Sequence, residues 1–374
     1  MFRFLHSSDL HLGKRFGNFA GDLPSRLREA RHGTLKRLAE QAKAHDAKTI
    51  LLAGDTFDTE TPAPEVRRQA LMEMGQHTDL TWVILPGNHD SLQATELWSR
   101  LTAECPANVI LAIDPSPIEI APKVVILPAP CTTRRPGRDL TEWMSAIDLA
   151  PDRFRIGLAH GAIQNFTEDS ATHDVIAPDR AQLSKLDYLA LGDWHGTMRV
   201  NERTYYSGTP EPDRFKHNRP GEALLVTLTA PGAAPQVTPV RVGSFDWQTL
   251  DLSLLSSEDP VARLNTSLPE AYARRQCLTK VTASGHTSLS NQSQLLALGE
   301  DIVPDFAWFE LNTEALRIDY APEDLDTIEL TGALRTAADT LLRELQDERL
   351  AATDRAIAAS ALSRLYRHLQ GAAQ

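Results

Sequence analysis

The first part of the chain alternates between short apolar runs and longer segments in which apolar residues recur every three or four positions. Short runs rich in Val, Ile and Leu are typical of buried strands, and the longer periodic segments are typical of helices with one buried face. Strands are predicted at 2–7, 48–53, 81–86, 108–112, 123–128, 154–159, 187–191, 204–207, 222–229 and 236–241. Helices are predicted at 24–45, 63–77, 92–103, 138–147 and 179–185. The mixture predicts an α/β fold, a layered sandwich of two facing sheets with helices outside them.

The pattern changes after residues 245–247, which predicts a domain boundary there. Helical and strand patterns then alternate in a shorter stretch, with helices expected at 259–268 and 288–299 and strands at 277–281 and 305–311. This combination predicts a small α+β cap.

The last segment is rich in Ala, Leu, Arg and Glu from residue 326 onward. Leu341, Leu342, Leu345 and Leu350 recur close to helical spacing, which predicts one or two amphipathic helices. We therefore expect three parts along the chain, with bounds at 1–248, 249–330 and 331–374.

Polar side chains that suit metal ions follow the ends of five predicted strands. Any one such motif alone is usually a surface turn or a satisfied core histidine, but independent turns have no reason to form this series. Open α/β sheets build their sites at strand ends, so the series predicts one shared metal site. The residues are Asp9 and His11, Asp55 with Asp58, Asn88 with His89 and Asp90, His160, and Asp193 with His195.

The local spacing supports convergence of these side chains. Asp9 and His11 are two positions apart, so they point the same way in extended chain, and Asp193 and His195 repeat the spacing. Gly54 allows the sharp turn that brings Asp55 out at the end of its strand.

These motifs resemble the calcineurin-like metallophosphoesterases. Within that superfamily they are similar to the bacterial SbcD nucleases and to their archaeal and eukaryotic DNA double-strand-break counterparts. The stretches that carry the resemblance are His-Ser-Ser-Asp-Leu-His-Leu-Gly (6–13), Ala-Gly-Asp-Thr-Phe-Asp-Thr (53–59), Pro-Gly-Asn-His-Asp (86–90) and Tyr-Ser-Gly-Thr-Pro-Glu-Pro (206–212). The similarity is specific over about residues 1–220, and it implies a metallophosphoesterase sandwich.

The resemblance implies a ligand set for two divalent metal ions. One ion would be held by Asp9, His11, Asp55 and His195, and the other by Asp55, Asn88, His160 and Asp193, so that Asp55 bridges them. Such a pair clamps a phosphate and activates water. In the family the histidine that follows the asparagine acts on the leaving oxygen, a role that falls on His89 here, with Asp90 or Asp58 expected to orient its ring.

One position departs from the family pattern. The usual final motif is Gly-His-x-His, whereas this chain has Gly192-Asp193-Trp194-His195. We expect Asp193 to be a ligand, with a role as a partner of another ligand as the alternative, and Trp194 to pack into the fold. A third carboxylate makes the site harder and favours Mn²⁺, with Fe²⁺ or Mg²⁺ as alternatives, over Zn²⁺.

Composition and charge modify this picture. The chain is 42% hydrophobic and 24% charged, as in globular proteins, and no apolar run is long enough to cross a membrane. We see no secretory signal, and Cys105, Cys131 and Cys277 form no close pair, so we expect a reducing, cytoplasmic location.

The net charge of −12 weighs against tight DNA binding by this chain alone. Basic residues are dense in two places, where they either form solvated faces or meet a phosphate. They are Lys14, Arg15, Arg26, Arg28, Arg31, Lys36 and Arg37, and then Arg199, Arg203, Arg214, Lys216 and Arg219.

Three functions are compatible with these observations. The foremost is a metal-dependent DNA nuclease of the SbcD type, which by resemblance would form a homodimer and work with an SbcC-like coiled-coil ATPase. The second is a phosphodiesterase for small molecules such as nucleotides or phospholipids, which the acidic charge favours. The third is a scaffold for DNA ends that has lost catalysis, against which the nearly complete ligand set counts.

Overall fold

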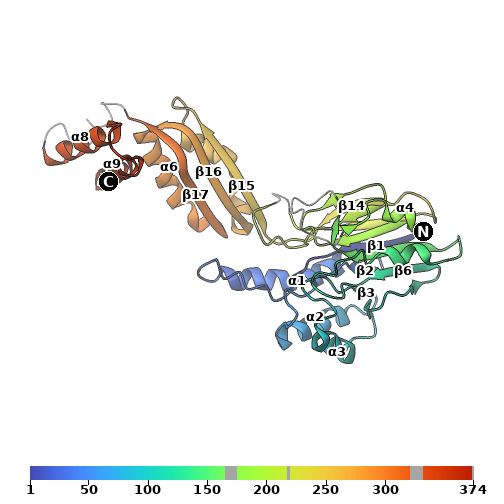
Figure 1. Ribbon diagram of the computed structural model, residues 1–374. Helices are drawn as coiled ribbons and strands as arrows, with labels where there is room; N and C mark the ends of the chain where they lie inside the picture. Colours follow the sequence, from blue (N-terminus) through green and yellow to red (C-terminus); the bar gives the residue numbers. More distant parts are fainter. Residues whose placement is uncertain (165–174, 217–219, 321–331, 373–374) are drawn as a thin grey trace. The chain divides into compact units, whose positions relative to one another are not determined.

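The computed structural model describes residues 1–164, 175–216, 220–320 and 332–372. The chain divides into two compact units, Met1–Trp247 and Gln248–Gln374. Figure 1 shows the first unit as a layered arrangement of sheets and helices. The two units are described separately below.

The first sheet of the first unit has six strands within the described residues, in the order β14-β13-β1-β2-β3-β4. β1, β2, β3 and β4 run parallel, whereas β13 and β14 are antiparallel to their neighbours. The strands are β1 (Phe2–Ser7), β2 (Thr49–Leu52), β3 (Thr81–Ile84), β4 (Val109–Leu111), β13 (Glu222–Leu228) and β14 (Gln236–Arg241). Three helices pack on its outer face (Figure 1): α1 (Leu23–Ala44), α2 (Pro64–Gln76) and α3 (Thr95–Glu104).

The second sheet also has six strands in the part of the chain that is described, in the order β11-β12-β10-β7-β6-β5. β6, β7, β10 and β12 run parallel, which places their carboxyl ends at one edge. The strands are β5 (Ile118–Ala121), β6 (Val124–Ala129), β7 (Phe154–His160), β10 (Tyr188–Gly192), β11 (Met198–Arg199) and β12 (Thr204–Tyr206). A short pair, β8 (Ala162–Ile163) and β9 (Val175–Ile176), and the turn of α4 (Arg180–Leu183) accompany it.

Successive side chains of the strands pack into two different apolar cores, one between the sheets and one beneath the helices. Phe4, Leu51 and Val83 point between the two sheets and meet Ile156 and residues of like character from the second sheet. Their sequence neighbours point the other way, toward the helices. Because successive side chains of a strand face opposite sides, buried strands are apolar throughout. The predicted sandwich of two facing sheets with helices outside is therefore confirmed.

Some elements of the first unit differ from the prediction. The helix expected at 138–147 is only a 3₁₀ turn, Glu142–Ala146, labelled η1. Asp139 accepts a hydrogen bond from the Thr141 amide, and such local bonds compete with helix initiation. The helix expected at 92–103 begins three residues later, at Thr95, and the one at 179–185 is reduced to α4. β5, β8, β9 and β11 were not expected.

The second unit is built on three strands in its described part, in the order β15-β16-β17. They are β15 (Asp246–Leu254), β16 (Cys277–Ser288) and β17 (Trp308–Asp319), of which β16 and β17 are parallel. β15 begins near the expected boundary. The strand expected at 277–281 continues to Ser288, and the one expected at 305–311 begins later, at Trp308, and continues to Asp319. α5 (Pro260–Ser267), α6 (Leu289–Asp301) and the 3₁₀ turns η2 (Ala271–Gln276) and η3 (Val303–Asp305) complete the unit.

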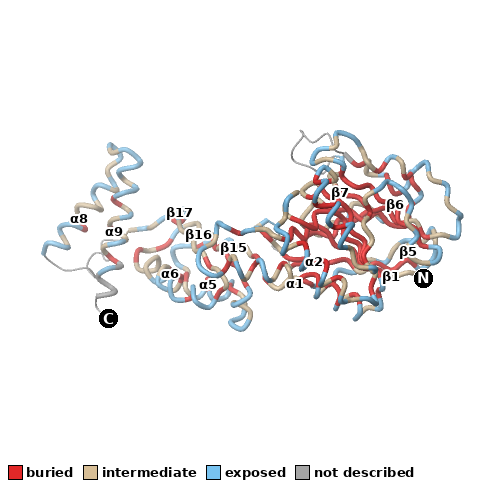
Figure 2. The backbone as a smooth tube through the Cα atoms, turned by 90° about the horizontal axis from the view of Figure 1, so that it is seen from below, coloured by how far each residue is buried: buried red, intermediate tan, exposed pale blue. Residues whose placement is uncertain are grey.

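Two helices end the described chain, α8 (Ala333–Gln346) and α9 (Ala352–Ala372), and they pack on each other. Their common core contains Ala338 and Leu362 with the half-buried Leu341 and Leu342. Figure 2 shows how few buried positions these helices have compared with the first unit. Residues 326–331 of the predicted terminal segment lie outside the described residues.

All three cysteines are free: Cys105 is half-buried, and Cys131 and Cys277 are buried. Over the described ranges, no helix combines the length and the apolar character that crossing a membrane requires.

Candidate metal centre

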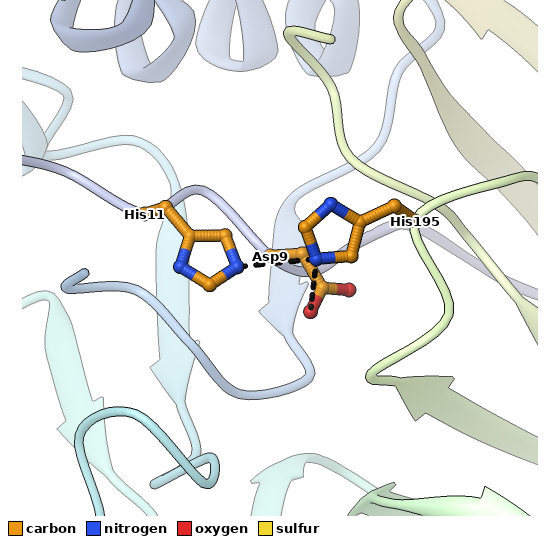
Figure 3. Close-up of side chains that lie close together, drawn as sticks. All are labelled: Asp9, His11 and His195. Carbon is orange, nitrogen blue, oxygen red and sulfur yellow. Dashed lines mark hydrogen bonds and ion pairs between the residues drawn. The ribbon is translucent and has the colours of Figure 1, made fainter. Parts of the chain in front are cut away.

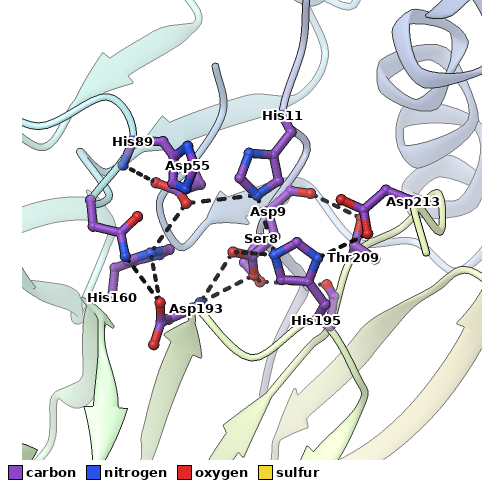
Figure 4. Close-up of polar contacts among 12 residues, drawn as sticks. Ser8, Asp9, His11, Asp55, His89, His160, Asp193, His195, Thr209 and Asp213 are labelled. Atoms are coloured by element: carbon purple, nitrogen blue, oxygen red, sulfur yellow. Dashed lines mark hydrogen bonds and ion pairs between the residues drawn. The ribbon is translucent and has the colours of Figure 1, made fainter. Parts of the chain in front are cut away.

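The predicted site residues lie at the carboxyl ends of parallel strands from both sheets. Asp9 and His11 follow β1, Asp55 and Asp58 follow β2, and Asn88, His89 and Asp90 follow β3. From the second sheet, His160 is the last residue of β7, and Asp193 and His195 follow β10. Because the two sheets face each other, these loops meet at one end of the sandwich, where Figure 4 shows their side chains converging.

Backbone hydrogen bonds fix the first two loops against each other. The amides of Asp9 and His11 donate to the carbonyl oxygens of Gly54 and Asp55, at 3.1 and 2.9 Å. Asp9, His11, Asp55 and Asp193 all have positive φ, at 55°, 44°, 53° and 99°. Residues other than glycine seldom adopt this conformation, and it persists where the surrounding structure enforces it, often at functional sites.

One group of possible ligands joins the two sheets: Asp9, His11 and His195, whose ligand atoms lie within 4.8 Å of one another. His11 Nε2 is 3.3 Å from His195 Nε2, and His195 Nε2 is 4.0 Å from Asp9 Oδ1 (Figure 3). Asp9 and His11 are buried. Two imidazole nitrogens and a carboxylate oxygen facing one point are a donor set for a divalent transition metal.

A second group lies beside the first and shares Asp9 with it. It consists of Asp9, Asp55 and His160, all buried. Asp55 Oδ2 is 3.7 Å from His11 Nε2 and 3.5 Å from His160 Nε2, so this oxygen lies between the two groups (Figure 4). The position is the one that a carboxylate shared by two ions would take.

Asn88 and Asp193 complete the second group. Asn88 Nδ2 donates to Asp193 Oδ1 at 3.1 Å, and Asp193 Oδ1 is 3.9 Å from His160 Nε2. The Asp193 amide donates to both oxygens of Asp9, each at 3.2 Å. Asp193 thus reaches the ligand groups and also partners Asn88, so both roles considered for it, ligand and partner of a ligand, stay predictions.

Two buried polar atoms test whether these residues fit a bound ion. In the described structure, His160 Nε2 and Asn88 Oδ1 are buried and have no hydrogen-bond partner. The other polar atom of each side chain is bonded, His160 Nδ1 to the Ala53 carbonyl at 2.9 Å and Asn88 Nδ2 to Asp193. Leaving a buried acceptor unpaired is costly, so these lone pairs fit coordination to a cation.

The electrostatics of the centre agree with that fit. Burial raises the pKa of Asp55 well above its usual range, against the opposing effect of His160. Burial lowers the pKa of His160, but the carboxylates of Asp55, Asp9 and Asp193 outweigh burial and raise the pKa to about 9. Divalent cations at this centre would supply the positive charge that these carboxylates favour.

His89 forms a third group of possible ligands with His11 and Asp58. Its ring is edge-on to that of His11, at 4.8 Å between centroids. Its Nδ1 is 2.9 Å from the main-chain oxygen of Asp58. The backbone of Asp58, rather than its carboxylate, therefore holds the ring. The Asp58 carboxylate lies 3.3 Å from His11 Nδ1 instead.

Asp90 has a different position from the one expected. Its carboxylate accepts hydrogen bonds from the amides of Phe57 and Gly87, at 3.0 and 2.7 Å, and it is buried. Asp90 therefore ties the loops after β2 and β3 together, which corrects the expectation that it contacts the His89 ring. Trp194 is half-buried against the core of the second sheet, as expected for packing.

Asp213 is a site residue that the sequence analysis missed. It follows β12, and its Oδ1 is 3.3 Å from His195 Nδ1. Lys14 and Arg214 pair with the same carboxylate, at 2.8 and 3.0 Å. A carboxylate on the outer nitrogen orients an imidazole ligand and directs its other nitrogen inward. The signal for Asp213 in the sequence was its position directly after the Tyr-Ser-Gly-Thr-Pro-Glu-Pro stretch, residues 206–212.

A close approach of the two sheets makes glycine necessary at the end of β10. A Cβ on Gly192 would lie 2.1 Å from the Ala53 carbonyl oxygen and 2.7 Å from His160 Nδ1. These distances are below van der Waals contact, so a side chain here would push the sheet edges apart. Gly54, at φ 90°, has the same constraint, with His160 Nδ1 2.3 Å from its added Cβ.

The two basic groups noted in the sequence are largely occupied within the protein. Arg31 is buried and donates to the carbonyls of Leu10 and Glu211, and Arg37 pairs with Glu211 at 2.7 Å. Arg203 donates to the Gly232 and Ala233 carbonyls. Arg199 and Lys216 lie over aromatic rings, and Arg219 is outside the described residues.

Comparison with known proteins gives a family match over most of the first unit. The family model of the calcineurin-like phosphoesterases matches residues 2–226. The SbcD component of nuclease SbcCD from Escherichia coli K12 is 40% identical over 93 residues, and the same figures hold for the O157:H7 strain. That match covers 24% of this chain and spans 22% of the relative's length.

Similarity to solved structures is more distant. The crystal structure of TT1561 of Thermus thermophilus has a TM-score of 0.40 and 10% sequence identity. The match covers 64% of this chain and 99% of that one.

Proposed function

Because this chain belongs to the calcineurin-like phosphoesterase family, we propose that its metal-dependent centre hydrolyses the phosphodiester bonds of DNA, as a nuclease of the SbcD type. The observation that carries the phosphoesterase function is the pair of Asp/His groups at the meeting edges of the two sheets. The local identity to the SbcD component of nuclease SbcCD supports DNA as the substrate. The proposed ligands come from both sheets, which supports a centre at the edges where the sheets meet.

The proposed ligands are those expected from the sequence. Asp9, His11, Asp55 and His195 would hold one divalent ion, and Asp55, Asn88, His160 and Asp193 the other. Two such ions activate water and neutralise charge on a phosphate. Three carboxylates with imidazoles and an amide suit Mn²⁺, with Fe²⁺ or Mg²⁺ as alternatives.

His89 is the residue proposed to act on the leaving oxygen. His89 Nδ1 donates to the Asp58 carbonyl, because a carbonyl oxygen only accepts, and Nε2 is left for the substrate. We propose that His89 transfers a proton to the leaving oxygen, as histidine does near neutral pH. The main-chain oxygen of Asp58 holds the His89 ring, while the Asp58 carboxylate contacts His11.

A phosphodiesterase for small molecules is the second candidate. The net charge of −12 favours it, because a protein that binds DNA alone usually presents a basic surface. For the nuclease, we propose that additional DNA affinity comes from an SbcC-like coiled-coil ATPase partner and from a homodimer. A monomer at micromolar concentration in light scattering would remove the homodimer.

The test is incubation of the purified protein with Mn²⁺ and linear DNA beside bis-p-nitrophenyl phosphate. Hydrolysis of both substrates by the wild type is the expected result, with DNA hydrolysis lost in His89→Ala. Hydrolysis of the small diester alone would favour the second candidate. If neither is hydrolysed with any of Mn²⁺, Fe²⁺ or Mg²⁺, the proposed function is wrong.

A further inference from the structure

A loop with three arginines adjoins the metal centre. It is residues 132–138, Thr-Thr-Arg-Arg-Pro-Gly-Arg, named here the arginine loop, and it follows β6 of the second sheet. Arg134, Arg135 and Arg138 are exposed. The sequence analysis did not single out this loop, although its preceding strand ends at the same sheet edge as the ligands.

Both ends of the arginine loop are anchored to the first unit, one of them beside the site. On one side, the Cys131 amide donates to the Pro86 carbonyl and the Leu92 amide donates to the Cys131 carbonyl, at 3.1 and 2.9 Å. These bonds flank the segment that carries Asn88 and His89. On the other side, Asp139 pairs with the buried Arg180 at 2.8 Å. The loop is therefore fixed relative to the centre.

A pocket of about 220 Å³ joins the arginine loop to the metal centre. Asn88, His89, His160 and Asp193 line it on the side of the centre. Arg134, Arg135 and Arg138 also line it, and because they are exposed they form its outer part.

Apolar side chains form the inner lining of the same pocket. Ala129 and Ile176 are buried, and Leu140 is half-buried. A ligand here would meet apolar surface on one side and guanidinium groups on the other. A sugar and base that carry a phosphate have this combination of properties.

The three guanidinium groups are available to an anion. Among the described residues, no carboxylate forms an ion pair with Arg134, Arg135 or Arg138. The nearest acid in sequence, Asp139, is engaged by Arg180 and by Thr141. Arginine presents several donors in a planar fork that matches phosphate oxygens.

We propose that this pocket is a nucleotide subsite for a single strand, next to the scissile phosphodiester. The inference rests on the proposed function and extends it to the substrate. The nucleotide that adjoins the cleaved bond would place its sugar and base against Ala129, Leu140 and Ile176. The arginine loop would bind its flanking phosphate.

The size of the pocket favours part of a strand over a complete small ligand. Sites that enclose drug-sized molecules measure roughly 300–1,000 Å³, which is larger than this pocket. A paired base carries its complement and would not enter so small a space. The subsite therefore favours an unpaired strand that continues beyond the pocket.

The experiment compares two substrates in the full-length protein with Mn²⁺. The dinucleotide dTpdT has one phosphodiester and no flanking phosphate, whereas single-stranded dT6 has both. The variant is Arg134→Ala, Arg135→Ala and Arg138→Ala combined. Its control is Arg68→Ala, Arg100→Ala and Arg263→Ala, which removes the same charge from helices α2, α3 and α5.

The wild type is expected to favour dT6 over dTpdT in kcat/KM, and the variant is expected to lose this preference. The control should keep it. A measurement that needs no turnover is the anisotropy of fluorescein-labelled dT6 in EDTA at several salt concentrations. Each lost phosphate contact should make the negative slope of log K against log salt shallower by about 0.7.

The outcomes separate the subsite from the proposed function. If the wild type hydrolyses bis-p-nitrophenyl phosphate and dT6, but the variant keeps the preference and the salt slope, the subsite is wrong and the function stands. If the control variant loses the preference for dT6 equally, the loss comes from the lower positive charge of the protein as a whole, and the subsite is also wrong. If the wild type hydrolyses neither substrate, the function fails and the subsite fails with it.

Discussion

The His89 ring is held through its Nδ1 by a main-chain oxygen, outside the two ligand groups that contain Asp9. We predict that His89→Ala keeps the metal content and the fold but lowers kcat by about 10²–10⁴-fold, the usual contribution of a general acid or base. The measurements are kcat on single-stranded dT6, whose alkoxide leaving oxygen has to be protonated, and metal content by mass spectrometry. His286→Ala, an exposed histidine of the second unit, is the matched control. Loss of metal from the His89 variant would make this residue a ligand.

Asp213 acts through His195, and its effect should appear in metal affinity. Removal of a carboxylate behind a ligating imidazole typically weakens metal binding by about 10–100-fold. We predict a weakening of that size for Asp213→Asn in a Mn²⁺ titration followed by calorimetry. Asp152→Asn removes a surface carboxylate that pairs with Lys123 and should change nothing. Equal affinities for both variants would remove the positioning role.

That the candidate ligand residues lie close together was predictable from sequence, because each lies at or after the end of an apolar strand. The orientation of their partners was not. Asp90 or Asp58 was expected to orient the His89 ring. Asp90 instead binds the amides of Phe57 and Gly87, and Asp58 reaches the ring through its main-chain oxygen. These contacts depend on how the loops meet. Asp213 and the arginine loop carry no motif of their own, and only tertiary contacts bring them to the site.

At the scale of elements, the edges of β2 and β10 approach closely at Gly192. We predict that Gly192→Ala lowers the free energy of unfolding by about 1–3 kcal/mol, the usual cost of overpacking. Urea unfolding is the measurement. Gly17→Ala, where an added Cβ meets nothing within 4 Å, should change stability by less than about 0.5 kcal/mol. Equal midpoints for both variants would contradict the close approach.

Strands that carry an apolar or alternating pattern between turn residues were predictable, and strands without such a pattern were not. β1, β13 and β14 agree with prediction within a residue, because their runs are bounded by turn residues. β16 and β17 extend beyond the predicted ranges through polar residues that pair only because the two strands are neighbours. β5 is short and mostly half-buried, so its pattern gives no signal.

At the scale of the whole molecule, every proposed ligand and His89 belong to the first unit, whereas α8 and α9 belong to the second. We predict that deletion of residues 331–374 preserves Mn²⁺-dependent hydrolysis of bis-p-nitrophenyl phosphate. The thermal transition of the second unit should fall, because α9 packs on α6. Calorimetry and the hydrolysis rate check these outcomes. A deletion variant that folds but has lost the hydrolysis would place part of the site in the terminal helices.

The central claim is a two-ion centre in which Asp55 is shared, and its most direct test is the metal content of the purified chain after equilibration with Mn²⁺. Asp55 Oδ2 lies between His11 and His160, so the carboxylate is within reach of both groups. We predict about two equivalents of Mn²⁺ for the wild type and none for Asp55→Ala, since a two-metal site depends on its bridge. Retention of one full equivalent by the variant would contradict the claim.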